Sequence, residues 1–153
     1  MKSLKIFLGP KTFWFSLLLT VATGLGCVNG RQKISPKLFN GTDLTGWEIT
    51  DFAGSGEIKV KDGELQIAMG ELISGINLAH DNIPRTNYEL EAEALKVDGD
   101  DFFCAITFPL GETYATFIPG GWGGSLVGIS SIDGMDAAEN ETASFKKFEK
   151  NQW

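Results

Sequence analysis

The sequence is poor in the groups that carry the most recognisable chemistry. Its 153 residues include two cysteines and one histidine, and they contain none of the patterns Cys-x-x-Cys, His-Glu-x-x-His or Gly-x-Ser-x-Gly. No glycine-rich phosphate loop follows an expected strand either. These absences exclude the zinc sites, the serine-hydrolase elbow and the phosphate-binding loop that such motifs identify.

Positive charge is also scarce. Thirteen Lys and Arg residues stand against twenty Asp and Glu residues, which gives a net charge of −7. Residues 1–26 contain three lysines and no acidic residue, so without them ten basic residues face twenty acidic ones and the net charge is −10. Nucleic acids and anionic lipid surfaces attract the opposite sign. A nucleic-acid partner is therefore excluded, and a neutral saccharide or a cation is favoured.

The sequence lacks an apolar run long enough to cross a membrane as a helix. Residues 12–22 are almost wholly apolar, whereas a spanning helix needs about 18 such residues. Lys2, Lys5 and Lys11 form a basic start, and small residues follow the apolar run, which is typical of a secretory signal peptide. We therefore expect residues 1–26 to be a signal peptide and the protein to be exported to the bacterial cell envelope or periplasm.

The two cysteines have different expected roles. Leu25-Gly26-Cys27 resembles a bacterial lipobox, in which Cys27 would carry lipid and attach the protein to a membrane surface without crossing it. Cleavage nearby by an ordinary signal peptidase is the alternative. Residues 27–37 are then a polar tether. Cys104 lies in an apolar segment and is expected to be a buried thiol with no disulfide partner.

The sequence is rich in glycine and in short segments where apolar and polar residues alternate. Nineteen glycines favour turns and strands, and Lys61-Asp62-Gly63 predicts a tight hairpin. Residues 87–97 alternate with a period of two, which favours a strand over the helix that their Glu, Leu and Ala content would allow. The expected strands are 46–50, 58–60, 64–69, 75–78, 87–97, 102–108, 113–118, 126–130 and 144–148. Together they predict an all-β sandwich of antiparallel sheets.

This domain is expected to occupy residues 38–153. Residues 145–153 stop where another strand should begin, so we expect the C-terminal strands of the sandwich to be missing. A sandwich that ends there would leave one strand edge unpaired and one apolar face uncovered.

Two short segments are candidates for ligand binding. Asp98, Asp100 and Asp101 cluster around Gly99, and three carboxylates on one turn can hold a divalent cation such as calcium. The same residues are also ordinary turn formers. Trp122 stands among four glycines, which leave its ring poorly covered and suited to stack on the apolar face of a pyranose. Packing over a neighbouring strand is the alternative for this ring.

Candidate proton donors and acceptors occur in two loops. The longest polar loop covers residues 132–142, and its functional candidates are Asp133, Asp136, Glu139, Asn140 and Glu141. Long loops on a rigid scaffold often carry function, although an acidic run can also be a solvated surface. His80 is the single histidine, and an imidazole side chain is suited to proton transfer. A solvated loop histidine is the alternative.

One family resemblance covers the whole expected domain. The segment Leu-Phe-Asn-Gly-Thr-Asp-Leu-Thr-Gly-Trp, residues 38–47, resembles the opening signature of the 3-keto-disaccharide hydrolase domain, often labelled family 16 glycoside hydrolase-like. Residues 60–65, residues 87–92 and Trp153 resemble later pieces of that family in the same order. The resemblance implies a concanavalin-like or laminin-G-like jelly roll with a sugar site on its concave sheet. It also implies cleavage of 3-keto-glycosides.

The implied reaction is an elimination followed by hydration. A ketone at C3 acidifies the C2 proton, a base removes it, a cation or hydrogen bonds stabilise the enolate, and the anomeric group leaves. By this resemblance the base would be Asp133, Asp136, Glu139 or His80, the turn of residues 98–101 would hold a cation, and Trp122, Asn140 and Glu141 would bind substrate. A non-catalytic carbohydrate-binding module of an envelope lipoprotein is the alternative, and a structural lipoprotein without a ligand is a third.

Overall fold

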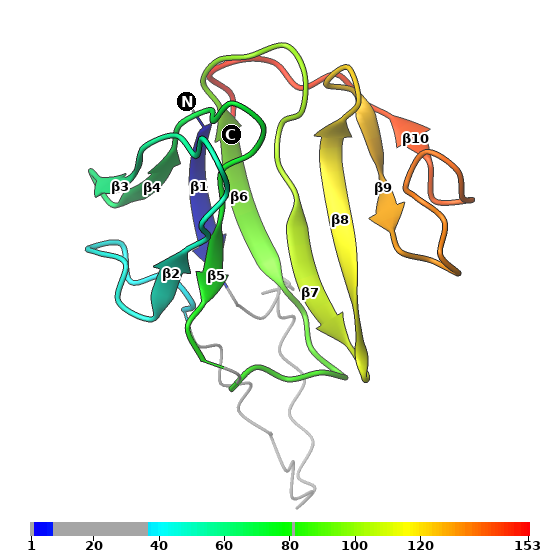
Figure 1. Cartoon of the computed structure of the whole chain (residues 1–153), viewed down its shortest axis with the longest axis horizontal. Helices are drawn as coiled ribbons and strands as arrows, with labels where there is room; N and C mark the ends of the chain where they lie inside the picture. Colours follow the sequence, from blue (N-terminus) through cyan, green and yellow to red (C-terminus); the bar gives the residue numbers. More distant parts are fainter. Residues whose placement is uncertain (1, 8–36, 81) are drawn as a thin grey trace, which may run out of the picture.

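A computed structural model describes residues 2–7, 37–80 and 82–153, and these residues form strands and loops without a helix (Figure 1). Every strand pair among them is antiparallel. The predicted all-β, antiparallel class is therefore confirmed. The strands are β1 (Lys2–Phe7), β2 (Trp47–Ile49), β3 (Ile58–Lys61), β4 (Glu64–Ile67), β5 (Ile76–Leu78), β6 (Glu91–Lys96), β7 (Ile106–Leu110), β8 (Thr113–Gly121), β9 (Leu126–Ser130) and β10 (Ser144–Phe145).

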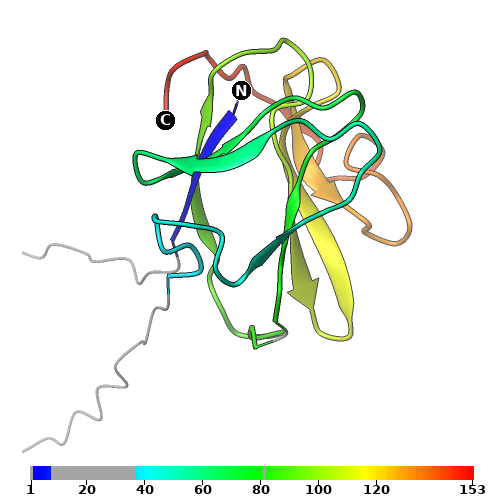
Figure 2. The same ribbon diagram turned by 60° about the vertical axis from the view of Figure 1, so that its left-hand side comes forward.

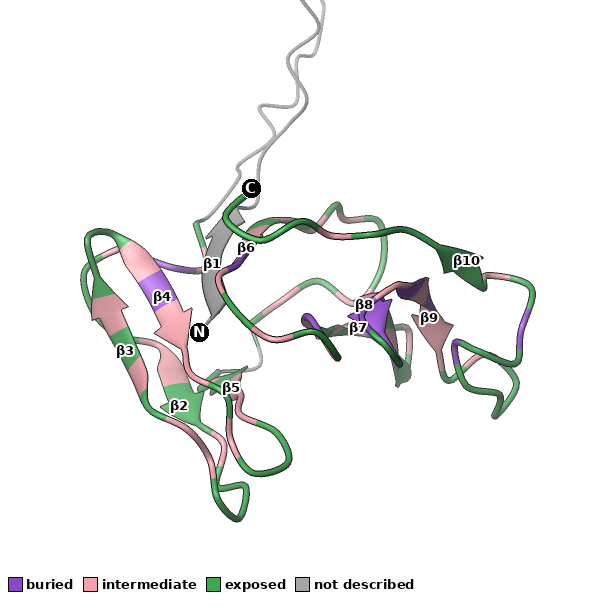
Figure 3. Cartoon of the chain, turned by 90° about the horizontal axis from the view of Figure 1, so that it is seen from above, coloured by how far each residue is buried: buried purple, intermediate pink, exposed green. Residues whose placement is uncertain are grey.

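The described strands form two larger sheets and one small one. The first sheet has the order β3-β4-β1-β6, the second has the order β10-β9-β8-β7, and β2 pairs with β5. Seen from above, the buried positions fall into one group on the side of β4 and another on the side of β8 and β9 (Figure 3). No described helix is long and apolar enough to span a membrane.

The hairpin between β3 and β4 follows the predicted turn chemistry. Asp62 and Gly63 both have positive φ, 53° and 79°, as a tight two-residue turn between antiparallel strands requires. Lys61 pairs with Glu64, and the ladder continues to Ile58 and Ile67. The Asp-Gly signal therefore located this turn correctly.

Some predicted strands are shorter or displaced. Residues 87–90 are not a strand, because Asn87 has a φ of 55° that breaks the extended chain ahead of β6. Residues 102–105 also lie outside β7; there the Phe103 N–H donates to the Gly120 carbonyl instead of joining the β7–β8 ladder. Cys104 is half-buried rather than buried.

The opening segment 38–47 is a hydrogen-bonded cap on the first core. The Asn40 side-chain oxygen accepts the Thr42 and Asp43 N–H groups, and Asp43 accepts the Thr45 N–H at 2.9 Å. The Asn40 amide, which donates to Asp43, is the main reason that the pKa of Asp43 is lowered. The Trp47 indole N–H donates to the Leu38 carbonyl at 2.8 Å. The segment that carries the family resemblance therefore builds the fold.

The two sheets have separate apolar cores. In the first, Leu65 has no exposed surface and Phe39 is buried beside it. In the second, Ile118 and Leu126 pack with Ala137 from the loop after β9. A Cβ at Gly128 would lie 3.1 Å from that of Ala137, so the glycine lets the loop approach β9.

The segment before β6 ties the first sheet to the β7–β8 hairpin. Arg85 donates to the carbonyls of Gly111 and Thr113, and its guanidinium lies 4.9 Å from the centre of the Tyr114 ring. The Tyr88 hydroxyl donates to the Pro109 carbonyl. These contacts fix one end of the second sheet against the chain that enters β6.

The sequence does not predict strand β1, because Lys2 and Lys5 are also typical of the start of a signal peptide. It lies between β4 and β6 and runs beside β6 (Figures 1 and 2). Residues 8–36, which include the predicted apolar run, Cys27 and most of the tether, lie outside the described residues. Signal cleavage, lipid attachment and missing C-terminal strands therefore stay predictions.

Candidate functional site

The Trp122 turn joins β8 to β9 with three consecutive residues of positive φ. The values are 30° for Trp122, 75° for Gly123 and 76° for Gly124. A non-glycine residue in this region costs energy unless its surroundings hold it there. The Trp122 side chain is 52 % exposed, so its ring is offered to solvent from a constrained backbone.

The aspartate turn of residues 98–101 lies directly against the Trp122 turn. The Gly123 N–H donates to Asp101 Oδ1 at 2.7 Å. A Cβ on Gly124 would come within 2.8 Å of the Asp100 carbonyl oxygen, which is closer than real Cβ atoms approach. The aspartate turn and the Trp122 turn, which are both candidates for ligand binding, are therefore neighbours.

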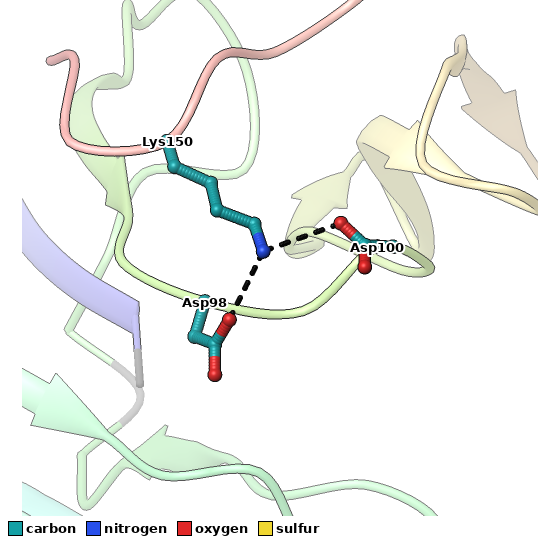
Figure 4. Close-up of polar contacts among 3 residues, drawn as sticks. All are labelled: Asp98, Asp100 and Lys150. Atoms are coloured by element: carbon teal, nitrogen blue, oxygen red, sulfur yellow. Dashed lines mark hydrogen bonds and ion pairs between the residues drawn. The ribbon is translucent and has the colours of Figure 1, made fainter.

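Lys150 joins this group from the C-terminal segment. Its ammonium nitrogen lies 3.0 Å from Asp98 Oδ1 and 3.3 Å from Asp100 Oδ1 (Figure 4). The pKa of Asp98 is lowered, first by the Gly99 N–H and then by Lys150, and the pKa of Lys150 is raised by its bond to Asp98. Sequence reasoning missed Lys150, because 52 positions separate it from Asp98.

The aspartate turn does not fit a divalent cation. Between residues 37 and 153, with residue 81 left aside, no three His, Cys, Asp or Glu side chains gather closely enough to hold a metal ion. The Lys150 ammonium already lies between Asp98 and Asp100, and Asp101 accepts a backbone N–H. A hard cation needs several oxygens that converge on one point. The positive charge beside Asp98 and Asp100 is that of Lys150.

Two aromatic side chains pack against the backbone that leads into the Trp122 turn. The rings of Phe103 and Phe148 lie 5.4 Å apart, centre to centre. A Cβ on Gly120, the residue that begins the bend, would lie 2.8 Å from Phe103 and 3.2 Å from Phe148. The turn thus rests on two phenylalanines that come from segments on either side of it in the sequence.

Most of the polar loop after β9 is committed to holding its own shape. Asp136 accepts the Ser130 hydroxyl at 2.5 Å and the Ala137 N–H at 2.8 Å, while Glu139 accepts the Asp136 N–H at 3.3 Å. Asn140 is buried, with 8 % of its surface exposed, and donates to the Ile129 and Asp136 carbonyls. Three of the five predicted functional residues are therefore structural.

The remaining predicted residues are exposed and dispersed. Asp133 has a φ of 52° at the tip of the turn closed by the Ile132–Met135 bridge, and Glu141 lies further along the same loop. His80 is exposed beyond the end of β5, in a different sheet. The structure does not bring His80 together with the acidic loop.

The Trp122 turn and the acidic loop lie at opposite ends of β9. The turn precedes Leu126 and the loop follows Ser130, and a strand of five residues spans about 13 Å between its first and last Cα atoms. The length of β9 therefore separates the turn that carries Trp122 from the loop that carries Asp133. The geometry does assemble an exposed indole on a turn whose backbone contacts the aspartate turn, which in turn binds Lys150, and these groups suit binding of a hydroxyl-rich ligand. Comparisons with protein-family models, curated proteins and solved structures find no match to this chain.

Proposed function

We propose that this chain is an exported carbohydrate-binding domain whose site is the Trp122 turn. The observation that supports it most is the half-exposed indole held on a strained glycine turn next to Asp98, Asp100 and Lys150. An indole face stacks on the apolar face of a pyranose, and charged groups at its edge form strong hydrogen bonds with hydroxyls. The excess of acidic residues favours a neutral ligand.

The rigidity of the turn strengthens this proposal. Binding costs less when the groups that contact the ligand are already ordered. The bond from Gly123 to Asp101 and the packing of Gly120 on Phe103 and Phe148 fix the backbone on both sides of the indole. The proposal extends to the fold: we place the two sheets in a concanavalin-like jelly roll of the 3-keto-disaccharide hydrolase type.

Isothermal titration with a panel of soluble oligosaccharides tests the binding site. Trp122→Ala is expected to weaken binding at least tenfold, about 1.4 kcal/mol, because the stacking platform is lost. Leu110→Ala is the matched control, since Leu110 is also exposed, at 58 %, and lies at the opposite end of β8 from the Trp122 turn. Equal affinity of Trp122→Ala and the unchanged protein for every sugar that binds would refute the proposal.

Cleavage of 3-keto-glycosides is the second candidate function. It is favoured by Asp133, whose carboxylate takes no part in the hydrogen bonds that fold the loop and is exposed on a left-handed turn. As the base, it would remove the C2 proton and leave Trp122 to bind a separate sugar unit. Asp136 is a poor choice for this role because Ser130 and Ala137 already occupy its carboxylate.

Turnover of 3-keto-glucosides separates the two candidates. Asp133→Asn should abolish cleavage if Asp133 is the base and leave sugar affinity unchanged. Asp136→Asn is a control for disturbance of the loop, which circular dichroism and thermal unfolding would reveal. A folded chain that binds sugar and cleaves none of these substrates would leave the binding domain as the function.

Export and lipid attachment remain part of the proposal. We place the protein in the cell envelope, held at a membrane surface by a lipid on Cys27 and by nothing else. Mass spectrometry of the mature protein would show a first residue of acylated cysteine. Cys27→Ser should then release the protein into the soluble periplasmic fraction, whereas an unmodified N-terminus near residue 27 would indicate ordinary signal cleavage.

A further inference from the structure

The first sheet depends on a strand that comes from the far end of the sequence. β1 pairs along both of its edges, with β4 through residues 2–4 and with β6 through residues 2–7. Within the described residues β6 has no other strand neighbour, and β4 otherwise pairs only with β3. Without β1, the sheet would reduce to the β3–β4 hairpin and a detached β6, and an isolated hairpin is marginally stable.

The register of β1 matches its alternating sequence. Leu4 pairs with Leu65 on one side and Ala94 on the other, in the row that contains the fully buried Leu65. Ile6 pairs with Ala92, the next position in that row. A slip by one residue would place both apolar positions in the opposite row, so the burial of Leu65 specifies this register.

In the opposite row of the sheet, Lys5 pairs with Glu93, which is exposed. Opposite charges directly across a strand pair are favourable. At the start of the strand Lys2 pairs with Lys96, so the match is confined to residues 4–6. The space between β4 and β6 therefore favours apolar residues at positions 4 and 6 and a basic residue at position 5.

We propose that this space is a strand-acceptor site, and that Lys2–Phe7 is a separable strand which completes the first sheet only while it remains joined to or bound by the domain. Addition of an extended segment to open sheet edges is an established mode of peptide recognition, with main-chain bonds that supply affinity and alternate side chains that supply specificity. This inference does not depend on the sugar site, which is built from the second sheet and the C-terminal segment.

The start of the chain then has two mutually exclusive states, one engaged for export and one paired between β4 and β6. Lys2 and Lys5 also form the basic start of the predicted signal peptide. A segment that is engaged for export cannot at the same time be paired between β4 and β6. Folding of the first sheet is then linked to whether residues 2–7 are available, and their removal leaves two unpaired edges that accept a strand of the same pattern.

Hydrogen exchange on the full chain tests whether β1 holds the sheet. Leu4→Asp combined with Ile6→Asp should raise exchange of β6 backbone amides at least tenfold, while amides of β8 and β9 keep their protection and show that the protein remains folded. Lys5→Glu is a milder variant that puts like charges across from each other at Glu93, and it should weaken strand binding about two- to fivefold. Unchanged exchange in β6 of the double variant would overturn the proposal.

Cleavage at Arg31 tests whether the strand is separable. Arg31 and Arg85 are the two arginines of the sequence, and Arg85 is half-buried with its guanidinium engaged by Gly111 and Thr113, so an arginine-specific protease is expected to cut after Arg31. Mass spectrometry verifies the position of the cut. The fragment 1–31 should co-elute with the domain, and the same fragment with Leu4→Asp and Ile6→Asp should not.

A labelled peptide of residues 1–8, added to the cut double variant, completes the test. Its fluorescence polarisation should rise on binding, and β6 amides should regain protection; a peptide with Leu4→Asp and Ile6→Asp should do neither. If the unchanged fragment 1–31 and the fragment with Leu4→Asp and Ile6→Asp co-elute equally with the domain, residues 8–31 hold them, and the proposal is overturned. Dimers that form on cutting and take up no peptide would also overturn it, because the open edges would then pair with a second copy.

Discussion

The two four-stranded sheets of this protein are assembled in opposite ways. The second sheet, β10-β9-β8-β7, joins strands that follow one another along the chain, so every pairing is between neighbours in the sequence. The first sheet, β3-β4-β1-β6, places residues 2–7 between strands that begin at residues 64 and 91. Long-range pairing pays more loop-closure entropy before it gains any contact. The first sheet is therefore the part whose integrity depends on distant sequence.

The cores of the two sheets also differ in the side chains that surround them. Leu65 and Phe39 are surrounded by half-buried apolar side chains from the opening segment and from β2 to β6. The second core has fewer half-buried apolar neighbours, and a loop held by Asn140 and Asp136 covers it. Apolar burial thus stabilises both sheets, and in the second sheet hydrogen bonds also position the loop that completes the core. Four predictions test this contrast.

The largest expected effect is that of Leu65→Ala in the first sheet. Truncation of a fully buried leucine removes its transfer free energy and leaves a cavity, which together cost about 3–4 kcal/mol. Urea unfolding would measure the loss, and hydrogen exchange should place it in β3 and β4. Leu72→Ala is the control, since Leu72 is 89 % exposed, and its effect should be within about 0.5 kcal/mol. Equal effects of the two substitutions would contradict the core assignment.

The next effect is that of Asn140→Ala, which should act on the second sheet. The change leaves the Asp136 carbonyl without its side-chain donor, the Ile129 carbonyl with only the Thr142 hydroxyl at 3.5 Å, and the Thr142 N–H without its acceptor. Loss of several bonds to a buried amide should cost about 2–3 kcal/mol. Exchange should quicken in β9 and not in β4. Glu141→Ala, at the exposed neighbouring position, should change stability little, and a comparable loss there would mean that the loop is not held by Asn140.

A matched glycine pair tests how the Trp122 turn meets the aspartate turn. Gly123→Ala and Gly124→Ala both place a side chain at a φ near 75°, which costs about 1 kcal/mol in each case. A Cβ at position 124 also collides with the Asp100 carbonyl, whereas position 123 has open space around it. Gly124→Ala should therefore be more destabilising by about a further 1 kcal/mol or more. Identical unfolding midpoints would show that the two turns are not in contact.

The smallest effect concerns the pH dependence of the ion pair at Lys150. The pKa of Asp98 is lowered in the folded chain, so its contribution to stability is present above the ordinary value of 3.8 and is lost as the pH falls through the lowered value. The pKa of Lys150 is raised, so its contribution is present below 10.5 and is lost as the pH rises through the raised value.

Thermal unfolding from pH 2 to pH 6 compares the unchanged protein with Lys150→Met. The variant should lose part of the acid-dependent drop in melting temperature, and the effect should shrink in high salt because the groups are solvated. Asp43→Asn removes the other carboxyl with a lowered pKa, which belongs to the first sheet. If Lys150→Met leaves the acid limb of the curve unchanged, the ion pair contributes nothing to stability.

Local patterns predicted local structure well. Asp62-Gly63 located its hairpin, and the expected strands 113–118 and 126–130 lie within β8 and β9, because turn geometry and local sequence pattern act within a few residues. The same logic failed for Lys2–Phe7, whose lysines and apolar residues suit both a signal start and an alternating strand. Only the register with Leu65 and Ala94 distinguishes these interpretations, and that pairing spans more than sixty residues.

The candidate site was predictable in part. Glycines around Trp122 correctly indicated an exposed ring, because residues without side chains cannot cover it. The roles of Asp136 and Asn140 were not predictable, since an acidic or amide side chain in a loop has the same appearance in sequence whether it binds a ligand or its own backbone. Asp98 and Asp100 were expected to attract a cation, and the cation that they attract is Lys150, from another part of the chain.

The bond from the Trp47 indole to the Leu38 carbonyl has a spectroscopic consequence. This indole is half-buried at the start of β2, where it packs against the first core, whereas the Trp122 ring is half-exposed at the end of the second sheet. With Trp14→Phe and Trp153→Phe, the chain would retain these two fluorophores alone. Trp47 should emit at shorter wavelength and resist a soluble quencher, and Trp122 should emit at longer wavelength and be quenched. A single emission scan during unfolding would then report the melting of the first core and of the second sheet separately.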